Sequence, residues 1–255
     1  MLAALKRHPF RIEAFFRFSL VVTYAFPEEV LRPLLPPGLT LDLYEGNAFL
    51  AIALVQTESL RPTGWPASMG RSFVLSGYRI FSRLTGADGK VMRGLRIVRS
   101  DTDSALMARL GNLTTHYRYT ACTAAIERTA SRLVVDIRTP DGAADLRVSA
   151  ALGEPVTSPP HGSPFPDLHT ARRFAGPLPF TFSYEEGTSS MVVVKGMRES
   201  WIPTPVDVAV DRCQFFRSPP WNSVTPRLAN AFLVENVPYR WDRGFRVPVP
   251  RDTPP

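Results

Sequence analysis

Apolar and polar side chains alternate between residues 16 and 24. Arg17, Ser19, Val21 and Thr23 fall between positions that are all apolar or aromatic. Side chains two positions apart point to the same face of a strand, so the alternation predicts a strand here. The residues expected on its apolar face are Phe16, Phe18, Leu20, Val22 and Tyr24.

A short helix is predicted directly after this strand. Pro27 suits the start of a helix, and Glu28 and Glu29 suit the positive end of its dipole. An apolar stripe follows, and a Pro-Pro-Gly sequence over residues 36–38 ends the helix. The stripe consists of Val30, Leu31, Leu34 and Leu35.

Strand-like runs recur along the rest of the chain and predict a mainly antiparallel α+β fold. Asp88-Gly89 and Asp141-Gly142 lie between such runs and predict hairpin turns. One more helix is predicted over residues 104–110, with Asp103 as its N-cap and Gly111 as its stop. The strand-like runs are 47–57, 71–84, 91–100, 113–128, 132–138, 145–152, 178–184, 190–198, 205–215 and 230–236.

Length and composition favour one domain over residues 1–255. A Pro-rich stretch over 153–179 has little apolar pattern and is expected to be a long loop. The polar, Pro-rich segment 246–255 is expected to be a flexible tail.

The net charge of +7 raises nucleic acid as a partner, but the basic residues are scattered singly, so no nucleic-acid partner is expected. The N-terminus does not fit a secretory signal, and no apolar run is long enough to span a bilayer, so we expect a cytoplasmic protein with no membrane partner. Cys122 and Cys213 are too few and too far apart for a zinc site or a disulfide framework. We found no nucleotide-binding or metal-binding motif and expect no cofactor and no metal.

Three segments carry a resemblance to a known family. They are Leu34-Leu35-Pro36-Pro37-Gly38-Leu39, the tryptophan in Ser200-Trp201-Ile202-Pro203, and the aromatic stretch 232–241. Together they resemble the acetoacetate decarboxylase-like superfamily, and most closely its uncharacterised bacterial YqjF-like branch. The resemblance implies a curved sheet wrapped into a cone-shaped barrel, with a few short helices and one internal pocket.

The resemblance also locates the superfamily's chemistry and shows what is missing. Ala108 stands where the decarboxylases carry the lysine that forms a Schiff base, and Arg109 stands at the second lysine. Leu50 replaces one of the accompanying glutamates, and the loop 65–68 offers no acidic residue for the other. Only Arg17 matches, at the position of an arginine that faces the substrate, so the usual imine mechanism is not implied. A surface arginine remains the alternative for Arg17.

Other polar residues are candidates for a site. Lys195 lies in an apolar strand and could be a desolvated catalytic amine, or a strand-end lysine with its ammonium in water. His116 could act as a general base oriented by Asp101 or Asp103, or be a structural histidine. Tyr78, Arg99 and Asp101 are the further candidates for contacts with a substrate.

These observations favour a pocket for a small organic-acid ligand or substrate. The protein is then either an enzyme, lyase-like and acting on an oxo acid without a lysine imine, or a non-catalytic binding protein on the same scaffold. Nucleic-acid binding ranks third. Related decarboxylases form oligomers, so a homo-oligomer is compatible with the resemblance, although no interface is specified.

Overall fold

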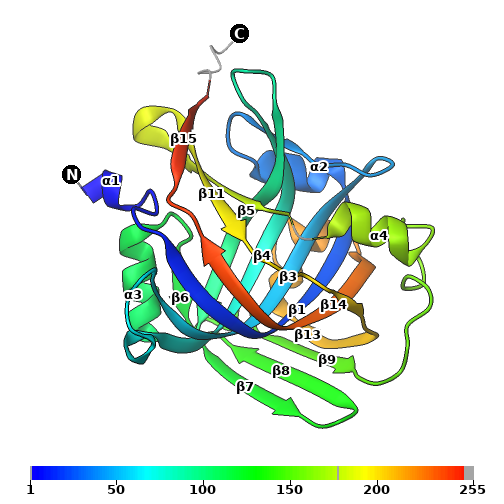
Figure 1. Ribbon diagram of the computed structural model, residues 1–255. Coiled ribbons are helices and arrows are strands. Elements are labelled where there is room, and N and C mark those ends of the chain that lie inside the picture. Colours follow the sequence, from blue (N-terminus) through cyan, green and yellow to red (C-terminus); the bar gives the residue numbers. More distant parts are fainter. Residues whose placement is uncertain (1, 177, 250–255) are drawn as a thin grey trace.

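Seven long strands form a strongly curved sheet that closes on itself (Figure 1). The computed structural model describes residues 2–176 and 178–249. Neighbouring strands in the ring are antiparallel except for the parallel pair β5 and β10, and β11 closes the ring on β14 through Gly196 opposite Trp241. In ring order the strands are β14 (Arg227–Trp241), β1 (Ile12–Pro27), β3 (Asn47–Pro62), β4 (Arg71–Thr85), β5 (Val91–Thr102), β10 (Phe180–Glu185) and β11 (Ser190–Met197). The predicted mainly antiparallel α+β fold with a curved sheet is confirmed.

Short strands extend the ring at its edges, and a second sheet packs against it. β2 (Leu39–Leu41) pairs with β4, β6 (Tyr119–Ala121) with β5, β12 (Thr204–Pro205) with β14, and β15 (Phe245–Pro248) with β11. The second sheet is antiparallel, in the order β13 (Val208–Cys213), β9 (Leu146–Ala151), β8 (Arg132–Arg138) and β7 (Thr123–Arg128).

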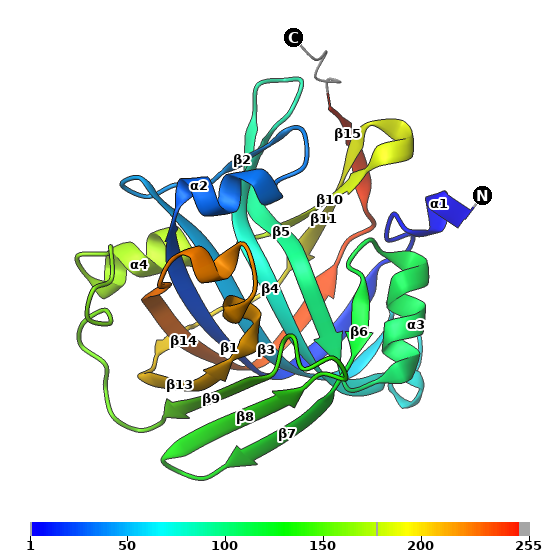
Figure 2. The same cartoon turned by 180° about the vertical axis from the view of Figure 1, so that it is seen from behind.

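The helices are short and lie around the ring. In both views α1 and α3 lie on one side of the molecule and α4 on the other (Figures 1 and 2). The α-helices are α1 (Leu2–Leu5), α2 (Glu28–Leu31), α3 (Ala105–Thr114) and α4 (Leu168–Ala175), and the 3₁₀ turns are η1 (Arg32–Leu34), η2 (Ala67–Met69), η3 (Glu186–Thr188), η4 (Gln214–Arg217) and η5 (Trp221–Ser223). Among the described residues, no helix combines the length and apolar composition needed to cross a membrane.

The two faces of the ring strands have different neighbours. On one face, Leu20 of β1 and Ile52 of β3 pack with Val135 and Val148 of the second sheet in the main core. On the other face, the side chains of β1, β3, β4 and β5 surround a cavity. One face of these strands therefore packs on a sheet, and the other lines the cavity.

A bulge in β1 changes the predicted face of one residue. The pairing of β1 with β3 shifts register between Phe16 and Phe18, so the two aromatic rings do not share a face. Phe18 lies in the main core, whereas Phe16 lines the cavity. The prediction that Phe16 lies beside Phe18 is wrong, because a bulge inserts one residue into the alternation.

The helix at residues 105–114 is longer than predicted. Ser104, not Asp103, caps its N-terminus, since the Ser104 hydroxyl accepts a hydrogen bond from the Met107 amide at 3.2 Å. Gly111 is an interior residue, not a stop: a Cβ there would lie 2.4 Å from the Tyr119 ring. A glycine that the sequence indicates as a helix end is needed for close packing instead.

The expected loop over 153–179 contains a helix and contributes to the core. Asp167 caps α4 by accepting a hydrogen bond from the Thr170 amide. Phe165 and Ala171 pack against Phe49 of β3, so this part of the segment is buried. In the expected tail, β15 takes in residues 246–248, while residues 250–255 lie outside the described residues.

Candidate functional site

A cavity of about 650 Å³ lies on the face of the ring strands that turns away from the second sheet. Its size is within the range of pockets that hold drug-sized ligands. Ala51 and Ala53 of β3 face it, and these small side chains leave room where larger ones would fill the ring. Most of the lining is apolar or aromatic, including Phe16, Phe73 and Phe232.

Arg79 of β4 brings a guanidinium into this apolar lining. It shares its strand face with Phe73, Leu75 and Phe81, all of which line the cavity. Arg79 forms no ion pair with any described residue, and its buried Nε has no hydrogen-bond partner. Burial lowers the pKa of this guanidinium below its ordinary value, although an arginine stays charged at any physiological pH. A partly buried cation without a partner is unfavourable, and an anion in the cavity would reduce that cost.

Tyr117 and Tyr119 bring phenol groups to the same cavity. Burial raises the pKa of both phenols, so their hydroxyls stay protonated and can donate hydrogen bonds. Asn112 of α3 holds the Tyr119 backbone: its Oδ1 accepts from the Tyr119 amide at 2.6 Å, and its Nδ2 donates to the Tyr119 carbonyl at 2.9 Å. The helix thereby fixes the strand segment that carries these rings.

The charged side chains of the described lining are all basic. This lining contains four arginines and neither a carboxylate nor a lysine. Arg61 is paired with Glu13 at 2.6 Å, and the Arg198 guanidinium lies over the Trp201 ring at 4.9 Å. Arg71, the fourth, is exposed, so Arg79 is the inner arginine left to bind a ligand.

His8 also lines the cavity and is 5% exposed. Its amide donates to the Thr114 carbonyl at 2.9 Å, which joins the N-terminal segment to the end of α3. Burial lowers the pKa of its imidazole, and its Nδ1 has no hydrogen-bond partner. The imidazole is therefore neutral near pH 7, and its unprotonated nitrogen can accept a proton.

Two residues expected at a site are exposed and lie outside the cavity lining. Arg17 of β1 forms an ion pair with Glu58 of β3 at 3.0 Å, and its position does not support a role in binding a ligand in the cavity. Lys195 of β11 is exposed, and Met191 and Val193 of the same strand are buried. The face that carries Met191 and Val193 is therefore buried only as far as Val193, and it is exposed at Lys195.

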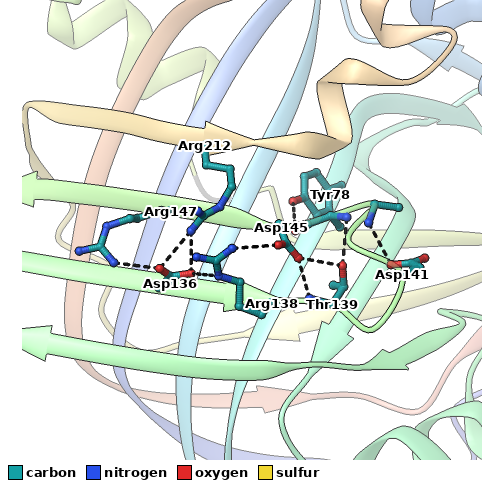
Figure 3. A network of polar contacts seen from close by, with 10 residues as sticks. Tyr78, Asp136, Arg138, Thr139, Asp141, Asp145, Arg147 and Arg212 are labelled. Carbon is teal, nitrogen blue, oxygen red and sulfur yellow. Dashed lines mark hydrogen bonds and ion pairs between the residues drawn. The ribbon is translucent and has the colours of Figure 1, made fainter.

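Tyr78, Arg99 and Asp101 come together, but on the face toward the second sheet. Arg99 pairs with Asp101 at 3.0 Å, and the Tyr78 hydroxyl donates to the Ala144 carbonyl at 3.4 Å. Figure 3 shows Tyr78 beside the polar network of the second sheet. This arrangement joins the two sheets, and neither Tyr78 nor the ion pair lines the cavity.

His116 has a different environment from the one expected. Its Nε2 lies 3.9 Å from Oε1 of Glu185, which pairs with Arg7 at 2.9 Å. Neither Asp101 nor Asp103 orients it. Burial lowers the pKa of His116, and the residue lies outside the described lining.

The two positions that the family resemblance assigns to lysines, 108 and 109, are also outside the described cavity lining. Ala108 is buried and Arg109 is exposed, whereas the cavity residues of α3 include Leu106, Met107 and Leu110. The three lysines of the chain are Lys6, Lys90 and Lys195, and all are exposed. Among the described lining residues there is no side-chain amine that could form an imine.

Sequence reasoning missed Arg79, although a signal for it exists. Residues 73, 75, 77, 79 and 81 alternate on one face, so Arg79 is a charged residue in the middle of an apolar set. Tyr117 and Tyr119 are two positions apart, the spacing of one strand face, and both line the cavity. What the sequence does not show is that these two faces meet, because residues 79 and 119 come from separate strands.

No group of three or more His, Cys, Asp or Glu side chains is arranged as metal ligands within residues 2–176 and 178–249. Cys122 and Cys213 are free, and burial raises their thiol pKa values to about 12 and about 11.

The ring sheet and its arrangement of helices define an acetoacetate decarboxylase-like fold, as comparison with solved structures shows. Acetoacetate decarboxylase from Legionella pneumophila is similar with a TM-score of 0.65 at 10% identity, covering 94% of this chain and 88% of that one. An acetoacetate decarboxylase-like enzyme from Sphingomonas wittichii RW1 gives 0.60 at 13% identity, covering 95% and 94%. The enduracididine biosynthesis enzyme MppR, complexed with pyruvate, gives 0.60 at 12% identity, covering 93% and 90%.

At the level of sequence, residues 14–224 match the DUF2071 family of uncharacterised conserved proteins, and the chain belongs to that family. No protein with a curated description matches it. Identities of 10–13% to the solved structures establish the fold and carry no catalytic residue over to this chain.

Proposed function

We propose that this protein, in the YqjF-like branch that its sequence resembles, binds an organic carboxylate that has an apolar body. The carboxylate lies against Arg79, with Tyr117 and Tyr119 as further donors, and the apolar body occupies the rest of the cavity. The observation that carries the proposal is the guanidinium of Arg79, which is surrounded by apolar side chains and has no ion-pair partner among the described residues.

A guanidinium suits a carboxylate because it can donate two parallel hydrogen bonds to the two oxygens. A hydrogen bond to a charged group contributes about 1.5–3 kcal/mol, so loss of Arg79 should weaken binding at least roughly tenfold to a hundredfold, the effect of one such bond. The apolar lining adds affinity in proportion to the area that the ligand buries. Longer or aromatic carboxylates should therefore bind more tightly than acetate.

The test is calorimetric titration with octanoate and with octanamide, its uncharged isostere. The wild-type protein should bind octanoate more tightly, and Arg79→Gln should lose that preference. Arg83→Gln is the matched control, because Arg83 lies on the same strand outside the described lining and pairs with Asp42. Unchanged octanoate binding by Arg79→Gln, or an equal loss in Arg83→Gln, would contradict the proposal.

An enzyme acting on an oxo acid is the second candidate, and His8 is the observation in its favour. His8 is a neutral, buried imidazole in the cavity lining and could move a proton. Nothing in the described lining supplies the amine that an imine mechanism needs. Incubation with 3-oxooctanoate, followed by NMR, separates the two candidates: conversion faster than the spontaneous rate, and slowed in His8→Gln, would establish catalysis.

A further inference from the structure

The mouth of the cavity carries most of the exposed large apolar side chains. Ten such side chains are exposed among the described residues, and seven of them line the cavity. We call these seven residues the apolar rim. They are Leu5 and Phe10 of the N-terminal segment, Trp65 and Met69 of the loop before β4, and Leu106, Leu110 and Leu113 of α3.

The rim is one surface built from three segments. Leu106, Leu110 and Leu113 have the i, i+4, i+7 spacing of a single helix face. The N-terminal segment is hydrogen-bonded to the end of this helix through the His8 amide and the Thr114 carbonyl. In two opposite views, α1 and α3 lie on the same side of the molecule (Figures 1 and 2). Contiguous exposed apolar surfaces of this kind commonly mark interaction sites.

The charge around the rim is basic. Residues 4–11, 61–71 and 105–114 contain six Lys and Arg residues and no acidic ones. Three of the six, Arg7, Arg11 and Arg61, pair with carboxylates from other segments. Lys6, Arg71 and Arg109 form no ion pair with any described residue and are exposed. Two copies of this surface would repel each other, whereas an anionic surface would attract it.

We propose that the apolar rim docks onto an anionic lipid bilayer, so that the cavity opens directly into the membrane surface. Apolar side chains framed by Lys and Arg are the usual composition of a surface that lies in the bilayer interface. Trp65 suits the headgroup region, where tryptophan side chains are enriched. The proposal departs from the sequence-based expectation of no membrane partner, because the rim comes together only in the folded chain.

Docking at this place would also give a carboxylate with an apolar body a path that avoids water. The rim side chains belong to the cavity lining, so apolar side chains line the path from the bilayer interface to Arg79. This consequence rests on the proposed function, but the docking does not, since none of the rim residues is Arg79.

The test is flotation of the full chain with vesicles of phosphatidylglycerol and phosphatidylcholine, and with vesicles of phosphatidylcholine alone. The protein should float with the anionic vesicles and be released by high salt. A triple variant, Leu106→Gln, Leu110→Gln and Leu113→Gln, should lose binding roughly tenfold or more, because three side chains leave the interface. The matched control is Val91→Gln, Ile202→Gln and Phe245→Gln, which changes the three exposed apolar residues outside the rim and should bind as wild type.

Charge is tested separately with Lys6→Gln, Arg71→Gln and Arg109→Gln combined, which should also weaken binding to anionic vesicles roughly tenfold or more. Equal binding to both vesicle types, or equal loss in the rim and control variants, would overturn the proposal. Sedimentation velocity showing a dimer that the rim variant disrupts, without vesicle binding, would assign the rim to a second copy instead. Arg79→Gln should float like wild type, which separates failure of docking from failure of carboxylate binding.

Discussion

The guanidinium of Arg79 lies across Gly77, two residues earlier on the same face of β4. A Cβ at position 77 would lie 3.1 Å from Nε and 3.2 Å from Nη2 of Arg79. The missing side chain of Gly77 therefore makes the space in which the only unpaired inner arginine of the described lining sits.

Gly77→Ala should displace Arg79 and weaken octanoate binding several-fold without preventing folding. The atoms that meet the new Cβ are the far end of a flexible side chain, so they can move by a few tenths of an ångström. Calorimetric titration and thermal unfolding measure the two effects. Gly187→Ala, whose added Cβ meets nothing within 4 Å, should leave both unchanged.

Arg79→Met should stabilise the ligand-free protein by about 1 kcal/mol or more, because it removes a buried charge that has no partner. Arg83→Met on the same strand should have the opposite sign and destabilise by about 1–2 kcal/mol, since Arg83 pairs with the fully buried Asp42. Arg93 still pairs with Asp42, which limits that loss. Urea denaturation of the two variants gives the comparison, and destabilisation of similar size in both would show that Arg79 has a structural partner.

Gly111→Ala should destabilise the protein by about 1–3 kcal/mol, although alanine is favoured over glycine in the interior of a helix. The added Cβ would lie 2.4 Å from the Tyr119 ring, and the backbone of Tyr119 is tied to the same helix by Asn112. Chemical denaturation measures the change. A stabilised variant would mean that helix propensity outweighs the contact, and that α3 does not position Tyr119.

His8→Gln should reduce the loss of stability on acidification. The folded-state pKa of His8 is lowered by burial, so the unfolded state binds more protons as the pH falls. The contribution of the neutral imidazole is complete above its unfolded pKa of about 6.5 and is lost below it, by at most about 1.4 kcal/mol per pH unit.

Unfolding measured between pH 8 and pH 5 should show a smaller slope in His8→Gln than in wild type. His169→Gln, which changes an exposed histidine, should keep the wild-type slope. If both variants behave like wild type, the pH dependence of stability has another source.

The strands were predicted from sequence with good accuracy, because their signal is local. The run 132–138 is β8, residue for residue, and the Asp88-Gly89 turn joins β4 to β5. The errors fall where a distant contact competes with the local pattern. The local pattern predicts a helix end at Gly111, but this glycine is an interior residue that packs closely against Tyr119. The bulge after Phe16 depends on how β1 pairs with β3.

The candidate site was less accessible to sequence analysis. The family resemblance points to Arg17 and the strand pattern points to Lys195. In the structure both side chains are exposed and lie outside the described lining. Arg79 lay in an equally suggestive pattern. Whether an arginine has a carboxylate partner depends on residues far away in the chain, so no local pattern distinguishes Arg79 from the paired Arg83.

The sequence by itself determined the order of the strands, the apolar face of most of them and the family to which the chain belongs, because alternation, turns and spaced motifs are properties of neighbouring residues. Only the tertiary structure decided that β11 returns to β14, that Arg79 and Tyr119 meet in one cavity, and that three separate segments form the apolar rim. These features depend on contacts between residues far apart in the chain, and such contacts arise only when the sheet closes.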